Sequence, residues 1–450
     1  MKKGITDRTT FQRLKELLPD KQTALSNIWI SLKTRNFRLY FSGMCVSLIG
    51  TWMQQIAMSW LVYKLTDSVF LLATVTFMAQ IPILLLTPFM SVFVDRYNRR
   101  NILLLTQSLS ALQALLLAGL TISGQIQVAH LMILSLFIGC VNALDNPTRQ
   151  AFYPALVAPS HLGNAIALNS AVINGSRLIG PAIGGIMIHL LGEGICFLAN
   201  GISYLGVIVA LLHMQLSPAP KKNKSAPLFT ELSDGFRYVS GNIPIRALLM
   251  MMAAVSFFGL PLVTFIPAYV KDILLGDSQM LGLLLSCIGT GSFAAALFLA
   301  ARKNTEGLGK AITVATVLLG LTLAYLSFIR IPWLAALICI PAGFSIIITV
   351  ASVNTLLQTL SDENKRGRVM GYMAMTFTGI SPIGSLALGS LEHYTGLENI
   401  ILLSGFCCTA AGIIFEYYRP LIRKYAHPVY LAKGIATEKN ESSRKSARGK

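Results

Sequence analysis

Long apolar stretches, separated by short polar segments, dominate the pattern of this sequence. Each apolar stretch holds few charged residues and reaches about 20 residues, the length that a helix needs to cross a bilayer. The pattern predicts twelve such helices, at residues 37–63, 69–94, 101–123, 128–150, 162–191, 194–214, 246–270, 278–301, 308–329, 332–360, 367–391 and 397–418. We therefore expect an all-α polytopic membrane protein.

One polar segment divides the twelve helices into two sets of six. It contains several prolines and lysines and carries too much charge to enter hydrocarbon. The predicted organisation is a basic N-terminal segment at 1–36, a six-helix bundle at 37–214, a linker at 215–245, a second six-helix bundle at 246–418 and a basic tail at 419–450. Three residues also recur at one constant offset, which favours a parallel duplication with substrate bound between the halves. They are Asn146, Gln150 and Gly163, which recur as Asn354, Gln358 and Gly371.

Composition and charge narrow the class of protein further. The chain is 54% apolar and 12% charged, whereas soluble proteins average roughly 25% charged residues. A formal net charge of +18 raises the question of nucleic acid, because a basic face is the footprint of phosphate binding. Here the charge lies in short segments between apolar runs and at the two ends, so the expected partner is the lipid bilayer and not nucleic acid.

The positions of the lysines and arginines predict the topology. If both termini are cytoplasmic, all but four of the 37 basic residues fall at the inner ends of the helices or in the segments outside the membrane on that side. Lys64, Lys271 and Arg330 fall outside, and Arg177 lies within a span. Such an asymmetry is the positive-inside pattern. We therefore expect a multi-pass membrane protein with both ends in the cytoplasm.

The polar segment after the second helix combines one acid with three arginines, namely Asp95, Arg96, Arg99 and Arg100. These groups can form an ion-pair clasp at the ends of two helices, and Asp95 near the start of the third helix would be favoured by its dipole. Ordinary positive-inside charge explains the arginines but leaves Asp95 unexplained. The segment is therefore a candidate gating loop.

This loop resembles the signature loop of the major facilitator superfamily, which lies between helices 2 and 3 and helps to gate the inward and outward states. Ser91 and Asn98 stand where that family has glycine, although Asn is the next best residue for a left-handed backbone. The corresponding loop of the second half, around Arg302 and Lys303, is basic but does not match the signature. The resemblance implies the major facilitator fold and an ion gradient, most readily of protons, as the source of energy.

Small residues repeat every four positions in the fifth helix, at Ser176, Gly180 and Gly184, so that a partner helix can approach closely. Pro181 removes a backbone hydrogen bond and permits a bend. A packing face without a transport role is one interpretation. However, Gly180 and Pro181 followed by Gly184 and Gly185 are similar to the fifth-helix motif of the antiporters in the superfamily, and this implies export.

Arg177 lies deep in the same helix, where a charge costs at least about 2.5 kcal/mol. Asp145, the only acid of the preceding helix, is its expected partner, but Asp145 and Arg149 are also one turn apart and can pair. A structural clasp and a role in proton or substrate coupling are equally favoured for this pair. The stretch around Asp145 resembles the branch that contains the enterobactin exporters and macrolide efflux proteins.

Polar and aromatic residues in the first and seventh helices are candidates for the lining of a substrate cavity. Such a lining suits a bulky amphipathic solute, although aromatic residues in a bundle more often serve packing or anchor the interface. The candidates are Trp52, Gln54, Gln55, Phe257, Phe258 and Tyr269, with Trp60 and Phe265 nearby.

The sequence shows no sign of enzymatic or ATP-driven chemistry. It has no GxxxxGK[ST] loop, no metal-ligand cluster and no nucleophile elbow, and its seven cysteines all fall in apolar stretches without the spacing of a zinc site. We expect a secondary active exporter of a small amphipathic molecule, either a siderophore or a drug-like compound, which uses proton antiport and no cofactor or metal. A monomer is expected, working with outer-membrane or periplasmic export components. The alternatives are an importer or lysophospholipid flippase on the same fold, and a membrane scaffold or sensor without transport.

Overall fold

The computed structural model describes residues 30–214, 228–302 and 307–432, and in these ranges it contains helices and no strand. Most of the predicted basic N-terminal segment, the first part of the linker, Lys303 and the end of the basic tail lie outside the described residues. Twelve spans in the described ranges are long and apolar enough to cross a membrane. The prediction of an all-α chain with twelve spans is therefore confirmed.

Each of these spans is built on one α-helix, with a short 3₁₀ turn added in the fourth and fifth, except the seventh, which is composite. The six of the N-terminal half are α3 (Arg35–Thr66), α4 (Val69–Arg96), α5 (Arg99–Ile122), α6 (Val128–Phe152), α7 (Leu162–Leu191) and α8 (Glu193–Leu212). The C-terminal half has α10 (Ile243–Ala254) and α11 (Pro261–Ala268), followed by α12 (Ser278–Ala300), α13 (Leu308–Leu326), α14 (Pro332–Leu360), α15 (Arg366–Thr395) and α16 (Leu397–Ala432). Two π turns, Val255–Gly259 and Tyr269–Ile273, complete the seventh span around α11.

Side-chain caps fix the starts of several helices. The oxygen of Ser68 accepts from the N–H of Leu71 at the start of α4, and Asp277 accepts from two N–H groups at the start of α12. Asn98 caps α5 in the same way, and its φ of −68° shows that its backbone is not left-handed, although Asn tolerates that conformation. The polar side chain is useful at this position because it accepts from a backbone N–H of the first helical turn, which has no partner within the helix.

The linker contains a helix that was not predicted, and the last span extends beyond its predicted limit. A helix, α9 (Leu228–Gly241), precedes the seventh span, and α16 continues to Ala432 although the predicted span ended at residue 418. Both additions are more polar than a membrane span requires, which is why a search for apolar stretches did not find them.

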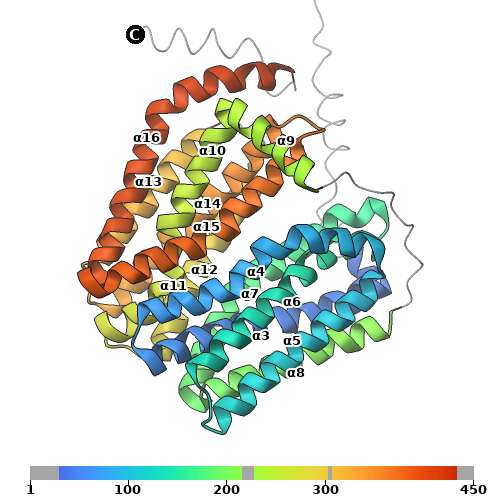
Figure 1. The fold of residues 1–450 in the computed structure, drawn as a ribbon, viewed down its shortest axis with the longest axis vertical. Coiled ribbons are helices and arrows are strands. Elements are labelled where there is room, and N and C mark those ends of the chain that lie inside the picture. Colours follow the sequence, from blue (N-terminus) through green and yellow to red (C-terminus); the bar gives the residue numbers. More distant parts are fainter. Residues whose placement is uncertain (1–29, 215–227, 303–306, 433–450) are drawn as a thin grey trace, which may run out of the picture.

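The helices form two lobes, one from each half of the sequence (Figure 1). Within the N-terminal lobe α4 packs on α6 and α5 packs on α8, and the equivalent pairs α12 with α14 and α13 with α16 form in the C-terminal lobe. Between the lobes, α7 packs on α12 and α4 packs on α15. The first contact joins the fifth span to the eighth, and the second joins the eleventh to the second. Interchanging the two halves therefore turns one contact into the other, as expected for lobes related by a pseudo-two-fold axis.

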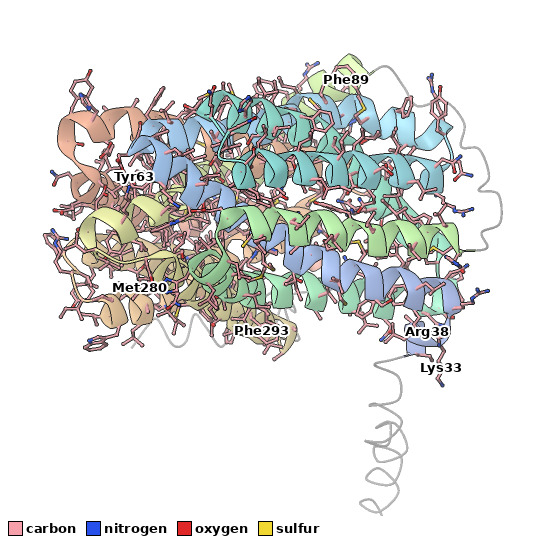
Figure 2. The ribbon with its side chains drawn as sticks, turned by 90° about the horizontal axis from the view of Figure 1, so that it is seen from below. Lys33, Arg38, Tyr63, Phe89, Met280 and Phe293 are labelled. Carbon is pink, nitrogen blue, oxygen red and sulfur yellow. The ribbon has the colours of Figure 1, made fainter. Side chains whose placement is uncertain are left out.

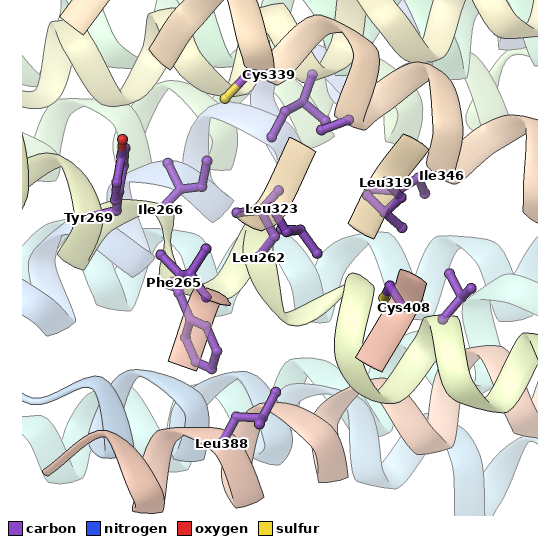
Figure 3. Packing of buried hydrophobic residues seen from close by; sticks show 14 of the residues in the cluster. Leu262, Phe265, Ile266, Tyr269, Leu319, Leu323, Cys339, Ile346, Leu388 and Cys408 are labelled. Carbon is purple, nitrogen blue, oxygen red and sulfur yellow. The ribbon is translucent and has the colours of Figure 1, made fainter. Parts of the chain in front are cut away.

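Two ends of the molecule are distinguished below. The far end carries Tyr63 and Met280, and the linker end carries Lys33 and Arg38 (Figure 2). Helix α9 also lies at the linker end, against α15. Apolar side chains fill the interior of each lobe, as in the cluster around Phe265, Leu319 and Cys408 of the C-terminal lobe (Figure 3). Many large apolar side chains remain exposed on the outside, where a bilayer would cover them.

Candidate functional site

Polar contacts join the two lobes at the far end. They are Tyr63 with Asp272, Lys271 with Asp67, His189 with Asp277 at 2.9 Å, and the hydroxyl of Ser278 with the carbonyl oxygen of Gly185 at 3.2 Å. The ion-paired side chains are between about one third and three quarters exposed, so each pair contributes at most about 1 kcal/mol. The lobes are thus held together at this end by several individually weak contacts.

The backbones of α7 and α12 approach closely below these contacts. A Cβ on Gly185 would lie 2.5 Å from the carbonyl oxygen of Ser278, and a Cβ on Gly282 would lie 2.6 Å from that of Pro181. Further along, a Cβ on Gly289 would lie 2.7 Å from the carbonyl oxygen of Arg177. Because Pro181 has no N–H, it cannot bond this last oxygen within the helix. Glycine is therefore required on both sides of the contact between the lobes.

The remaining small residues of α7 face α3 and not the other lobe. A Cβ on Gly180 would lie 2.5 Å from Cβ of Trp52, and a Cβ on Gly184 would lie 3.2 Å from Cα of Met53. The stripe predicted in the fifth helix is thus confirmed as a packing surface, but it serves two partner helices. Gly180 and Gly184 pack within the lobe, and Pro181 and Gly185 pack between the lobes.

Arg177 lies at the junction of these two packing surfaces. Its guanidinium carbon lies 5.2 Å from the centre of the Trp52 ring, a cation–π contact worth about 0.5–2 kcal/mol. No carboxylate among the described side chains pairs with Arg177, so the expected pairing with Asp145 is wrong. Since α3, α7 and α12 meet here, the cation stands where the two lobes separate or close.

Asp145 is committed to a different set of partners. Its side chain is 4% exposed, pairs with Arg149, and accepts hydrogen bonds from Thr106 at 2.6 Å and Gln107 at 2.9 Å. Both carboxylate oxygens are therefore bonded, and the buried charge of Arg149 is compensated. The predicted pairing of Asp145 with Arg149 is found, with two partners from α5 that the sequence did not indicate.

The candidate gating loop lies at the linker end. Arg99 donates to the carbonyl oxygen of Ala151, and Arg100 donates to those of Leu211 and Leu212, so these cations cap the C-terminal ends of α6 and α8 within the N-terminal lobe. Arg96 is exposed. Asp95 belongs to the last turn of α4 and not to the start of the third helix, and its side chain is outside the described ones.

Two of the predicted cavity residues lie inside the lobes instead. Gln54 accepts from Asn200 at 2.8 Å and donates to Gln113 at 2.9 Å, which forms a chain of amides between α3, α5 and α8. Tyr269 is fully buried, and its hydroxyl donates to the carbonyl oxygens of Leu326 and Ile329. A polar group in a span needs a partner, and here the neighbouring helices of the same lobe supply it.

The other predicted cavity residues keep accessible surface. Gln55 is exposed, and Trp52, Phe257 and Phe258 are half-buried. The rings of Phe257 and Phe258 contact each other at a centroid distance of 4.8 Å. These four residues stay candidates for the lining. The polar residues Gln107, Gln113 and Asn200 were not predicted, although each is an amide within an apolar span, and this signal could have identified them.

A cavity of about 340 Å³ lies between α4 and α15 at the linker end, and we call it the α4/α15 cavity. It is lined by Ile83, Leu84, Thr87, Pro88 and Ser91 of α4, and by Gly367, Arg368, Gly371, Tyr372, Ala374, Met375 and Thr378 of α15. This cavity could not be predicted from the sequence, because it depends on how two helices of different lobes diverge.

Comparisons with known proteins agree with this architecture. Residues 26–427 match a family model described as transmembrane secretion effector. The staphyloferrin A transporter of Staphylococcus aureus is 26% identical over 385 residues, which cover 84% of this chain and 95% of that protein. The enterobactin exporter EntS of Salmonella typhimurium is 26% identical over 344 residues, which cover 74% of this chain and 80% of that protein. The predicted resemblance to the siderophore exporter branch is thereby confirmed.

A solved structure shares the fold at low sequence identity. It is a bacterial homologue of the human lysosomal transporter Spinster in an inward-facing and unoccupied conformation, with a TM-score of 0.63 and 11% identity. The match covers 90% of this chain and 98% of that one. At this identity it supports the arrangement of the helices and nothing about the substrate.

Proposed function

We propose that this chain, which belongs to the transmembrane secretion effector family of the major facilitator superfamily, exports a small amphipathic molecule by proton antiport. The chain is a multi-pass membrane transporter and not an enzyme. The observation that carries the proposal is Arg177, a cation within a span that lies on Trp52 where the lobes meet. Placing a charge within the membrane costs free energy, so we expect this cation to bind the transported molecule or to interact with the coupling ion. A siderophore or a drug-like compound has the size and the acceptor groups that such a site would take.

Alternating access explains how the two ends would be used. The excess of basic residues at the linker end favours its placement in the cytoplasm, with both termini on that side of a bacterial inner membrane. The far end, where the polar contacts join the lobes, then faces the periplasm. In this arrangement the structure corresponds to a state closed to the periplasm, and export requires the far-end contacts to open while the linker end closes.

Asp145 is the group that we assign to the proton. Its carboxylate holds Arg149 and two donors of α5, so that protonation would remove the charge that compensates Arg149 and loosen α6 from α5. Such a change links a proton to the packing of a helix, which is what antiport requires. A purely structural clasp predicts no such link, and the variants described in the Discussion separate the two.

Inside-out membrane vesicles test the direction and the energy source together. We expect an amphipathic fluorescent compound to accumulate in vesicles that contain the protein and to leave when a protonophore is added. Accumulation only in right-side-out vesicles would indicate an importer, and movement of labelled lysophospholipid alone would indicate a flippase. The absence of flux for every solute and lipid tried, with correctly inserted protein, would contradict transport and favour a scaffold or sensor.

We further propose that the protein acts as a monomer and delivers its substrate to the periplasm, where outer-membrane or periplasmic components would continue export. The support is that both lobes of the transport path come from one chain. Size-exclusion chromatography with light scattering of the protein in detergent tests this, and a stable dimer would contradict it.

A further inference from the structure

The α4/α15 cavity has an apolar wall on α4 and, on α15, a patch of backbone left open by two glycines. Ile83, Leu84 and Pro88 of α4 form the wall. On the opposite side, a Cβ added to Gly367 or Gly371 would meet no heavy atom within 4 Å, so these two glycines leave the backbone of α15 open to the cavity. A volume of about 340 Å³ lies within the range of pockets that bind small molecules. An aliphatic chain fits such a surface.

Thr87 and Arg368 are the two polar groups of the cavity that concern a charged ligand. The hydroxyl of Thr87 is buried and has no hydrogen-bond partner in the described structure, although a threonine in a helix commonly bonds the carbonyl one turn back. The guanidinium of Arg368 lies at the same cavity and presents donors suited to a carboxylate or phosphate. An orphan hydroxyl and an arginine on an apolar pocket are the groups that fix the head of an amphipathic anion.

A carboxylate of the chain itself already lies on Arg368. Asp234 of α9 pairs with it at 3.3 Å, while the two side chains remain 26% and 53% exposed. Helix α9 is positioned closely for this contact, because a Cβ on Gly235 would lie 3.0 Å from the ring of Tyr372 and 3.3 Å from Cβ of Arg368. The pair is long and partly solvated, so an incoming anion could replace Asp234 at small cost.

The outer surface of α4 connects this cavity with the bilayer. Leu85 and Phe89 are more than half exposed beside the lining residues, and Figure 2 shows Phe89 at the edge of the molecule. A ligand that arrives with its chain in the membrane and its charge at the interface therefore meets the apolar wall first and Arg368 second.

We propose that the α4/α15 cavity binds an amphipathic anion from the bilayer, with its aliphatic part on α4 and its anionic group on Arg368, and that Asp234 takes the place of this group when the cavity is empty. Occupancy would then release α9 from α15. The binding site goes beyond the proposed export function, since it would couple a membrane component to the position of the linker helix whatever solute is transported.

The test uses the full chain in nanodiscs of phosphatidylcholine and a photoreactive fatty acid as the probe, with the corresponding fatty alcohol as the uncharged control. We expect the acid to label residues 83–91 and 367–378, as mapped by mass spectrometry, about tenfold more than the alcohol. Arg368→Gln should reduce this labelling about tenfold, Arg368→Lys should restore part of it, and Asp234→Asn should increase it. Loss in Arg368→Gln with recovery in Arg368→Lys separates the missing charge from a folding defect.

Filling the cavity provides an independent arm. Gly371→Leu has open space for its side chain and should abolish labelling, whereas Gly119→Leu, at an exposed glycine of α5 with equally open space, should leave it unchanged.

Anionic phosphatidylglycerol in the disc identifies the source of the anion: suppressed labelling assigns the cavity to lipid phosphate, and unchanged labelling assigns it to free carboxylate. Equal labelling by acid and alcohol, or labelling that survives both Arg368→Gln and Gly371→Leu, overturns the proposal. Because labelling needs no transport, a failed export assay leaves this result unaffected.

Discussion

Polar side chains that are close in the sequence, or alike in carrying a charge within a span, differ in whether neighbouring helices already occupy them. Gln54 and Gln55 are neighbours in the sequence, yet Gln54 is bonded inside the N-terminal lobe and Gln55 is exposed. Asp145 and Arg177 are both charges within spans, yet the first is compensated by three side chains and the second lies on an aromatic ring. Of these four side chains, Gln55 and Arg177 are therefore the two that can contact a transported molecule.

Replacement of Arg177 tests its role in transport. Arg177→Ala removes the cation and its contact with Trp52, so we expect at least about a tenfold loss of export. Arg177→Lys keeps the charge but loses the planar stacking, and should keep part of the activity. Efflux of a fluorescent compound from cells checks both, with the amount of membrane-inserted protein as the control. Normal export by Arg177→Ala would remove this residue from the mechanism.

The pair of Asp145 and Arg149 is tested by a double variant. Asp145→Asn leaves Arg149 buried without a counter-charge and should destabilise the protein by about 3–5 kcal/mol, which thermal unfolding in detergent would detect. Adding Arg149→Gln removes the uncompensated charge and should restore most of the stability. If proton-driven export then returns as well, the pair is a structural clasp. If stability returns without proton-driven export, Asp145 is the coupling group.

At the scale of elements, close helix contacts explain the glycines of α7 and α12. Gly185 and Gly282 bring the two backbones together across the lobes, and Gly180 and Gly184 do the same within the N-terminal lobe. The sequence pattern predicted a bare helix face because small residues recur every four positions. It could not predict that α12 would be the second partner, since contacts between the lobes depend on the tertiary arrangement.

A larger residue at Gly185 should interfere with closure of the far end. Its Cβ would lie 2.5 Å from the carbonyl oxygen of Ser278, so Gly185→Val should destabilise the closed contact by about 1–3 kcal/mol. We expect a cysteine placed near Met280 to become more reactive toward a membrane-impermeant thiol reagent, in a background without the native cysteines. The matched control is Gly119→Val in α5, where the space is open. Unchanged reactivity in Gly185→Val would mean that this contact does not control closure.

The extent to which the sequence predicted each element follows from the same physics. The twelve spans were predicted because a bilayer demands long apolar helices whatever their neighbours are. The far-end contacts, the orientation of Tyr269 and the α4/α15 cavity were not predicted, because they depend on which faces of distant helices meet. Helix α9 was missed because its amphipathic sequence lies in a segment that charge excludes from the membrane.

At the scale of the whole molecule, the balance between the two ends determines the conformation. Each far-end contact is weak, and a transporter that opens at this end must break all of them in each cycle. At the linker end, Arg99 and Arg100 bond the carbonyl ends of α6 and α8 within the N-terminal lobe, and Arg368 pairs with Asp234 within the C-terminal half. In this structure, therefore, the four polar contacts described at the far end link the lobes.

Neutralising the far-end pairs should shift this balance. Asp272→Ala together with Lys271→Ala removes the contacts to Tyr63 and Asp67, and we expect the population open at the far end to increase about fivefold. Distance measurements between spin labels on the ends of α3 and α12 would detect the shift. Lys64→Gln, which breaks an ion pair with Glu193 inside the N-terminal lobe, is the control that should leave the distances unchanged. Identical distances in the double variant would exclude these pairs from the closure.

The two π turns of the seventh span have a mechanical consequence. Each widened turn holds one residue more than an α-helical turn would, and each lies where the span changes its neighbours, Phe257 against α15 and Tyr269 against the end of α13. If either turn tightens to α-helical geometry, the segment beyond it rotates by about 100°. Each π turn of the seventh span therefore supplies one extra residue, and loss of that extra residue from the turn would rotate one part of the helix about its axis while the other part stays packed in its lobe.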